Sequence, residues 1–138
     1  TDKQNRIISV GYNSFVRGIN DNVLPTLPPE KYKWFRHAEE SAILNARCNL
    51  TDCVAWICGP PCLNCAQLLY QSGIMEWHIY NINLPKMCCE EEYRKDINIF
   101  INLSGVKVVY HSLDEEILDN VTKRYQDSRT DIENCKLS

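Results

Sequence analysis

Residues 53–73 read CVAWICGPPCLNCAQLLYQSG, and this stretch predicts a buried strand followed by a helix. The run 53–58 is apolar without alternation, which is typical of a strand covered on both faces. Gly59-Pro60-Pro61 ends the run, and proline suits the first turn of a helix that we expect from about Cys62 to Gln71. Gly73 follows as a usual helix terminator. A strand that passes through a tight turn into a helix favours a layered α/β fold.

Periodicity along the rest of the chain predicts further strands and helices in alternation. We expect strands at 6–10, 77–82 and 106–110, helices at 38–49, 90–103 and 114–125, and an irregular loop at 12–33. Because a whole helix connects the strands at 77–82 and 106–110, these two strands are expected to be parallel. We therefore predict one α/β domain over residues 1–126, followed by a polar tail at 127–138.

The composition argues against several classes of protein. The 138 residues carry a formal net charge of −3 and no evident basic stripe, unlike proteins that bind long stretches of phosphate backbone. No apolar run has the length needed to cross a bilayer, which predicts no membrane partner. The 8 cysteines would fit a disulfide-built secreted domain, but the long helical and strand patterns need no such crosslinks. We therefore expect free thiols in a reducing, cytoplasmic setting.

Residues at two predicted helix starts form a candidate metal centre. Cys62 and Cys65 are three positions apart, so both thiolates can reach one ion from the same helix face. With the imidazole of His37 they supply three of the four ligands of a tetrahedral zinc, which leaves one position for water and indicates a catalytic ion. Glu39 is expected just inside the helix that follows His37, directed at the water as a proton carrier.

Other interpretations of these residues stay open. An isolated C-x-x-C motif could be redox-active or part of a structural zinc site, and the latter would need a fourth ligand such as His78 or His111. Both histidines occur in strand-like runs, where an ordinary strand residue is the simpler interpretation. Cys88-Cys89 could belong to a second metal site, although two adjacent cysteines at a helix start need no special role.

These motifs resemble those of the cytidine deaminase superfamily, and within it the deoxycytidylate (dCMP) deaminases. The resemblance covers about residues 6–80 and includes HAEESAI at 37–43, PCLNC at 61–65, GYN at 11–13, RG at 17–18, KYKW at 31–34 and QSGI at 71–74. It implies a mixed sheet flanked by helices, with the last two strands parallel. It also implies zinc-dependent hydrolytic deamination of dCMP to dUMP, a step in thymidylate supply.

By position, the resemblance implies roles for further residues. Asn13 would hydrogen-bond the sugar of the substrate, and the backbone of Ala38 would contact the base. Four basic residues would face a phosphate of the substrate or of an effector: Arg17, Lys31, Lys33 and Arg36. Members of this family are often homo-oligomers regulated by dCTP and dTTP, so the resemblance implies a homo-oligomer with these effectors.

The sequence also departs from the family pattern. A helix and a first strand that usually precede this region are not seen before Arg6. Cys58 and Pro60 replace a usual threonine and an aromatic residue beside the zinc cysteines, which bears on substrate preference.

Two rival functions remain at this stage. A deaminase of single-stranded nucleic acid or tRNA would need a basic channel with stacking aromatic side chains. A non-catalytic, zinc-containing regulatory domain would have no use for the carboxylate of Glu39.

Overall fold

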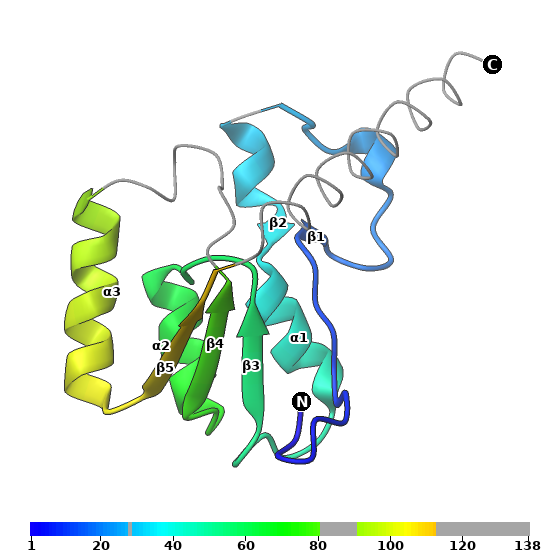
Figure 1. The fold of residues 1–138 in the computed structure, drawn as a ribbon. Coiled ribbons are helices and arrows are strands. Elements are labelled where there is room, and N and C mark those ends of the chain that lie inside the picture. Colours follow the sequence, from blue (N-terminus) through cyan, green and yellow to red (C-terminus); the bar gives the residue numbers. More distant parts are fainter. Residues whose placement is uncertain (28, 81–90, 113–138) are drawn as a thin grey trace.

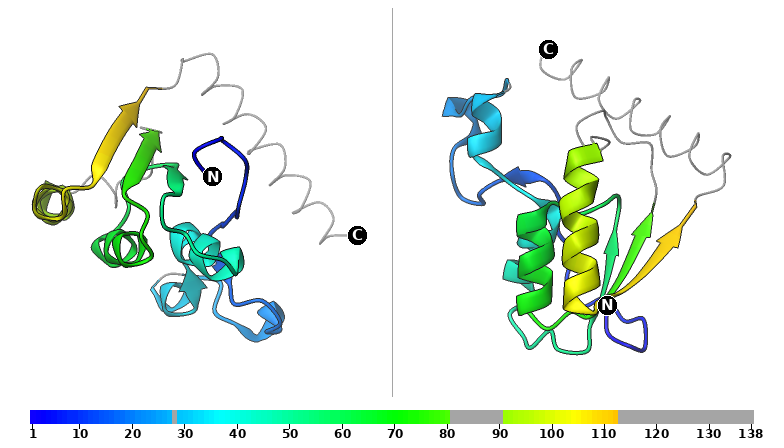
Figure 2. Two further views of the ribbon diagram at one scale, coloured as in Figure 1. Left: turned by 90° about the horizontal axis from the view of Figure 1, so that it is seen from below. Right: turned by 90° about the vertical axis from the view of Figure 1, so that its left-hand side faces the viewer.

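The computed structural model describes residues 1–27, 29–80 and 91–112, which form two small sheets with helices packed beside them. The strands are β1 (Ser14–Phe15), β2 (Phe35–Arg36), β3 (Val54–Ile57), β4 (Glu76–Tyr80) and β5 (Lys107–His111). The helices are the 3₁₀ turns η1 (Asp21–Val23) and η2 (Glu30–Lys33) and the α-helices α1 (Ala38–Ala46), α2 (Leu63–Gln71) and α3 (Glu91–Ser104). The three α-helices lie on one face of the larger sheet (Figures 1 and 2).

The larger sheet has the strand order β3-β4-β5, and both of its strand pairs are parallel. Glu76 pairs with Lys107 and Tyr80 pairs with His111, so the predicted parallel arrangement of the last two strands is confirmed. β1 and β2 form a separate antiparallel ribbon, which makes the described strands mixed in direction. The α/β class predicted from the sequence is therefore correct.

Successive side chains of β4 point alternately to the two faces of this sheet. Trp77 and Ile79 are 0% and 1% exposed, and they pack in the core beneath α2 and α3. The indole N–H of Trp77 donates to the backbone oxygen of Ile74 at 2.8 Å, so its one polar group is satisfied. Glu76, His78 and Tyr80 alternate with these residues and therefore point to the opposite face.

Most predicted elements occur, but α1 is shorter than the sequence suggested. The helix ends at Ala46, three residues before the predicted end at Asn49, because Arg47 adopts a left-handed conformation with φ of 50°. Leu50 is buried in the core, so it prolongs the apolar pattern although the helix has already ended. The predicted loop at 12–33 is confirmed except for β1 and the two short 3₁₀ helices.

The strand predicted at 6–10 is wrong. The chain reverses near Asn5, which has φ of 60°, and it is Thr1 that pairs with the edge of β3. The amino group of Thr1 donates to Val54 O at 2.8 Å, and the N–H of Val54 donates back to Thr1 O at 2.8 Å. Residues 6–10 run alongside α1 instead, where the hydroxyl of Ser9 donates to Ala42 O at 2.7 Å.

Several predictions concern residues that the structure does not describe. The helix at 114–125, the tail at 127–138 and Cys88-Cys89 lie outside the described residues, and so the proposed domain limits stay predictions. Among the residues described, no helix combines the length and apolar character that crossing a bilayer requires.

Gly11 allows the N-terminal segment to lie directly against α1. A Cβ atom at this position would lie 1.9 Å from Ala38 O and 2.4 Å from Ala42 N. Both of these atoms belong to the helix backbone, so they cannot move aside as the end of a flexible side chain would. Only glycine permits this close approach.

We expect Gly11→Ala to lower the free energy of unfolding by about 3 kcal/mol or more, because the added methyl group must push the segment off α1. Gly18→Ala is the control, since nothing lies within 4 Å of the added Cβ and only the positive φ of 88° opposes it. That conformational cost is about 1 kcal/mol. Urea unfolding measures both variants, and equal losses would contradict the contact argument.

Candidate metal centre

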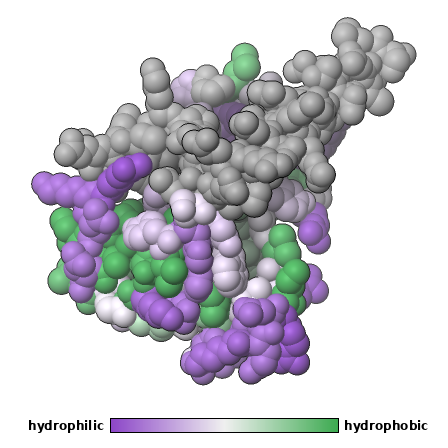
Figure 3. All heavy atoms as spheres, in the orientation of Figure 1, coloured by the Kyte–Doolittle hydropathy of each residue, from purple (hydrophilic) through white to green (hydrophobic). Residues whose placement is uncertain are grey.

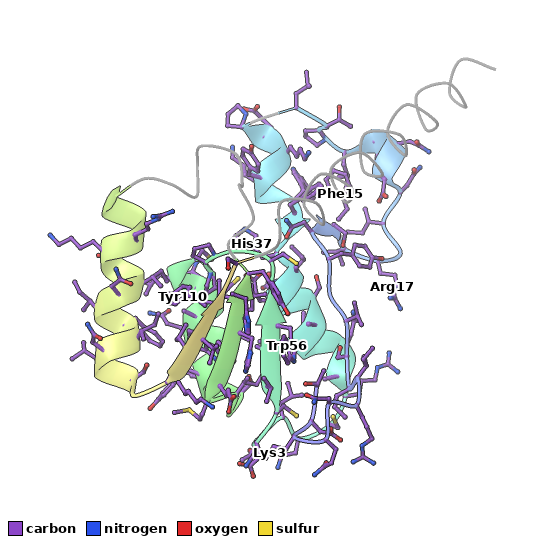
Figure 4. The ribbon with its side chains drawn as sticks, in the orientation of Figure 1. Lys3, Phe15, Arg17, His37, Trp56 and Tyr110 are labelled. Atoms are coloured by element: carbon purple, nitrogen blue, oxygen red, sulfur yellow. The ribbon has the colours of Figure 1, made fainter. Side chains whose placement is uncertain are left out.

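The helix starts of α1 and α2 meet at the edge of the larger sheet where its parallel strands end. β3 ends at Ile57, and the chain passes through Gly59-Pro60-Pro61 to Cys62, the N-cap residue of α2. His37 is the N-cap residue of α1 and lies at the same end of the strands (Figure 4). In α/β sheets this carboxyl edge is the usual place for a binding site.

Three donor atoms converge at these two helix starts. The ligand atoms of His37, Cys62 and Cys65 all lie within 4.8 Å of one another. Nδ1 of His37 is 3.4 Å from the sulfur of Cys62 and 3.4 Å from the sulfur of Cys65. Zn–N and Zn–S bonds in a tetrahedral site put such nitrogen and sulfur atoms about 3.6 Å apart. The donor set and its spacing therefore fit one zinc ion.

The exposure of the three residues leaves one side of this group open. Cys65 is 2% exposed, Cys62 is half-buried and His37 is exposed. The inner thiol is thus shielded by protein, while the imidazole side faces solvent.

The two thiols titrate very differently. Hydrogen bonds from the Cys65 thiol and backbone N–H, together with the nearby His37, lower the pKa of Cys62 to about 5 against the opposing effect of burial. The same thiol hydrogen bond, burial and the charge of Glu39 raise the pKa of Cys65. The two cysteines therefore carry one negative charge readily, as the Cys62 thiolate. Deprotonation of Cys65 as well requires a cation beside it, and a bound zinc ion supplies that cation.

Glu39 lies beside the donor group, as its position one residue inside α1 predicts. Its carboxylate is close enough to the Cys65 thiol to hydrogen-bond it and to raise its pKa. Glu40, the next residue, is turned away and forms an ion pair with Arg36. The two adjacent carboxylates are thus in different environments, and only that of Glu39 adjoins the thiols.

Asn13 and Ala38, the two residues expected to contact substrate, form a hydrogen bond with each other. The N–H of Ala38 donates to Oδ1 of Asn13 at 2.9 Å. The side chain of His37 makes no capping hydrogen bond, so an acceptor from another segment satisfies this free N–H at the helix start. Asn13 thereby holds the first turn of α1, a role that the sequence did not reveal.

The four basic residues are spread over the loop and its edges. Arg36 is paired with Glu40, and Nζ of Lys31 lies 4.7 Å from the centre of the Phe35 ring. Lys33 is exposed at the end of η2, and Arg17 is exposed on the loop and points away from His37 (Figure 4). Their expected contacts with phosphate stay predictions.

A groove of about 720 Å³ runs along the helical side of the molecule. Its lining residues are Glu40, Asn64, Gln67, Leu68, Tyr70, Gln71 and Phe100. None of the three donor residues lines it, and neither does Glu39. We therefore place the candidate site at the donor group rather than in this groove.

Comparison with known sequences matches residues 1–81 to the family described as the cytidine and deoxycytidylate deaminase zinc-binding region. This match contains all three donor residues. Together, the family and the donor geometry support one zinc ion in this chain.

Individual relatives agree with the family match. An uncharacterized deaminase encoded in the luxG 3′ region of Aliivibrio fischeri is 43% identical over 72 residues, which is 52% of this chain and 49% of that protein. A probable deoxycytidylate deaminase of Caenorhabditis elegans is 45% identical over 78 residues, covering 53% of this chain and 40% of the relative. The deoxycytidylate deaminase of Homo sapiens is 37% identical over 84 residues, which is 54% of this chain and 46% of that protein.

The chain matches about half the length of these relatives or somewhat less. The matched residues 1–81 include β3 and β4 of the parallel sheet and all three donor residues. This chain belongs to the family of proteins that carry the cytidine and deoxycytidylate deaminase zinc-binding region.

Proposed function

We propose that this chain carries out the zinc-dependent hydrolytic deamination of dCMP to dUMP. The observation that carries the proposal is a three-donor group with an adjacent carboxylate, Glu39, at the open edge of the sheet. A structural zinc site would be closed by a fourth protein ligand, and no fourth histidine, cysteine or acidic residue joins the group within the described residues. Relatives named deoxycytidylate deaminase support the choice of substrate.

His37, Cys62 and Cys65 would hold the ion, and Glu39 would handle protons. Zinc, when bound, lowers the pKa of water toward neutrality. The carboxylate of Glu39 would accept one proton of the attacking water and pass it to the ring nitrogen N3, and would then take the second proton from the new hydroxyl group and pass it to the departing amine. The new C4–O bond replaces the C4–N bond, so that ammonia leaves and one proton stays on N3 of the uracil.

Asn13 and Ala38 would orient the substrate. The amide group of Asn13 keeps its two N–H donors after Oδ1 has accepted from Ala38, so it can still donate to a sugar hydroxyl. The Ala38 N–H would reach the base only if Asn13 shifts, which makes the pair a point where binding and helix capping compete. Arg17, Lys31, Lys33 and Arg36 are the candidates for contacts with phosphate or with dCTP and dTTP as effectors.

We further propose a reducing, cytoplasmic setting and a homo-oligomeric assembly. The five cysteines of the described residues are all free, and two of them, Cys48 and Cys58, are exposed. Exposed free thiols favour a compartment that keeps them reduced. The oligomeric assembly rests on the family resemblance alone.

Glu39→Gln should retain zinc and lower the rate of ammonia release from dCMP by about 100-fold or more, because the amide cannot accept a proton. Glu40→Gln is the matched control, since Glu40 pairs with Arg36 and adjoins no thiol. Its rate should stay close to that of the unchanged protein. Retained activity in Glu39→Gln would rule out the proton role.

Cys62→Ser should reduce the zinc content from about one ion per chain to background, because it removes the thiolate of lowest pKa from the donor group. Cys58→Ser provides the control, since Cys58 is an exposed free thiol four positions earlier. Elemental analysis after dialysis measures both proteins. Equal zinc in the two variants would show that the ion is held elsewhere.

A substrate panel tests the choice of dCMP. The protein is incubated separately with dCMP, dCTP, cytidine and single-stranded DNA, and ammonia release is followed in each case. We expect dCMP to be converted fastest, since the net charge of −3 disfavours a nucleic-acid strand. Conversion of the oligonucleotide while dCMP is inert would overturn the proposal, and no conversion of any substrate would favour a regulatory domain.

A further inference from the structure

A second group of imidazole and carboxylate side chains lies on the face of the larger sheet that the α-helices leave uncovered. We call it the histidine cluster, and it consists of Glu76, His78, Lys107 and His111, with Trp56 packed beside it. Figure 3 looks onto this face, and its middle shows hydrophilic and intermediate colours rather than one continuous hydrophobic patch. The label of Trp56 in Figure 4 marks the place of the cluster on the strands.

The two histidines point ring nitrogens at each other. Nδ1 of His78 lies 2.7 Å from Nε2 of His111, and the ring planes differ by 17°. At this distance one nitrogen must be a lone-pair acceptor, since two N–H groups would repel. One ring nitrogen therefore donates its N–H to the lone pair of the other, and removal of that proton would leave two lone pairs directed at one point.

Glu76 determines which ring nitrogen of His78 carries the proton and which one keeps its lone pair. Its Oε1 lies 3.0 Å from Nε2 of His78, so this nitrogen carries a proton and Nδ1 keeps its lone pair toward His111. Nζ of Lys107 lies 2.9 Å from the same oxygen. The hydrogen bonds from His78 and Lys107 lower the pKa of Glu76, which keeps it a carboxylate. A carboxylate behind an imidazole is the usual support of a metal-binding histidine.

The rings are held in place but remain accessible. The Trp56 ring centre lies 4.2 Å from that of His78, and the Tyr80 ring centre lies 4.9 Å from that of His111. The side chain of His78 is 16% exposed, and His111 is half-buried at the last position of β5. Water can therefore complete the coordination shell of an ion on the solvent side.

We propose that His78 and His111 form a second metal site, which binds one divalent transition-metal ion of the kind that prefers imidazole, such as Zn²⁺, Ni²⁺ or Cu²⁺. The metal replaces the proton between the rings. Two nitrogens on one tetrahedral ion lie about 3.3 Å apart, so the pair must open by about 0.6 Å. His111 is the last residue of β5, so no further residue of that strand follows it.

This site shares no residue with the candidate catalytic centre. The chain has three histidines, and the third, His37, belongs to the cysteine-containing group. The two sites also differ in donor chemistry, because sulfur ligands hold zinc in the first and only imidazole nitrogen is offered in the second. Metal at the second site can therefore be measured while zinc stays in the first.

The test is a nickel titration of the full chain already loaded with one equivalent of zinc. Free thiols are first blocked with iodoacetamide, so that cysteines outside the zinc group cannot bind nickel. We expect calorimetry to detect one equivalent of Ni²⁺, and both His78→Gln and His111→Gln to abolish it with the first zinc retained. Glu76→Gln should weaken Ni²⁺ binding by about 10-fold, because it removes the support of His78.

Glu30→Gln is the matched control, since it removes an exposed carboxylate on η2 and should leave nickel binding unchanged. A second measurement needs no variant: one equivalent of Ni²⁺ should broaden the ring-proton NMR signals of two of the three histidines. Nickel binding that both histidine variants retain would overturn the proposal, as would unbroadened histidine signals in the unchanged protein.

Discussion

The meeting of two helix N-termini at one edge of a parallel sheet is the constraint on which the candidate active site depends. α2 begins after the short turn that follows β3, and α1 begins beside it; His37 and Cys62 are the N-cap residues of these two helices. Free N–H groups and the positive end of each helix dipole favour negative charge there. Hydrogen bonds from the Cys65 thiol and backbone N–H stabilise the thiolate of Cys62, and the donors for a cation that would stabilise the second thiolate are already in place.

The position of α1 is not determined by the sheet alone. This helix is joined to the N-terminal segment through the close approach at Gly11, the hydroxyl of Ser9 and the cap from Asn13. Each contact fixes the height or rotation of the helix that carries His37 and Glu39. A segment without regular secondary structure thus sets the geometry of the metal centre, since errors of an ångström at such a site are costly.

The two faces of the larger sheet carry different groups of side chains. On one face, Trp77 and Ile79 of β4 fill the core beneath the helices. On the other, the intervening residues of the same strand form the histidine cluster with β5. Because the two sets alternate along β4, packing of the core fixes the register, and that register brings the two histidine rings together.

The sequence by itself determined the order of the elements from α1 to β5 and the donor set expected for the metal centre. The apolar run, Gly59-Pro60-Pro61, the cysteine spacing and the helical connection between the last strands are local patterns that follow from helix and strand geometry. Only the tertiary structure decided that residues 6–10 lie against α1, that Asn13 caps Ala38 and that His78 faces His111. These contacts join residues 25 to 33 positions apart, and local periodicity carries no information about such pairs.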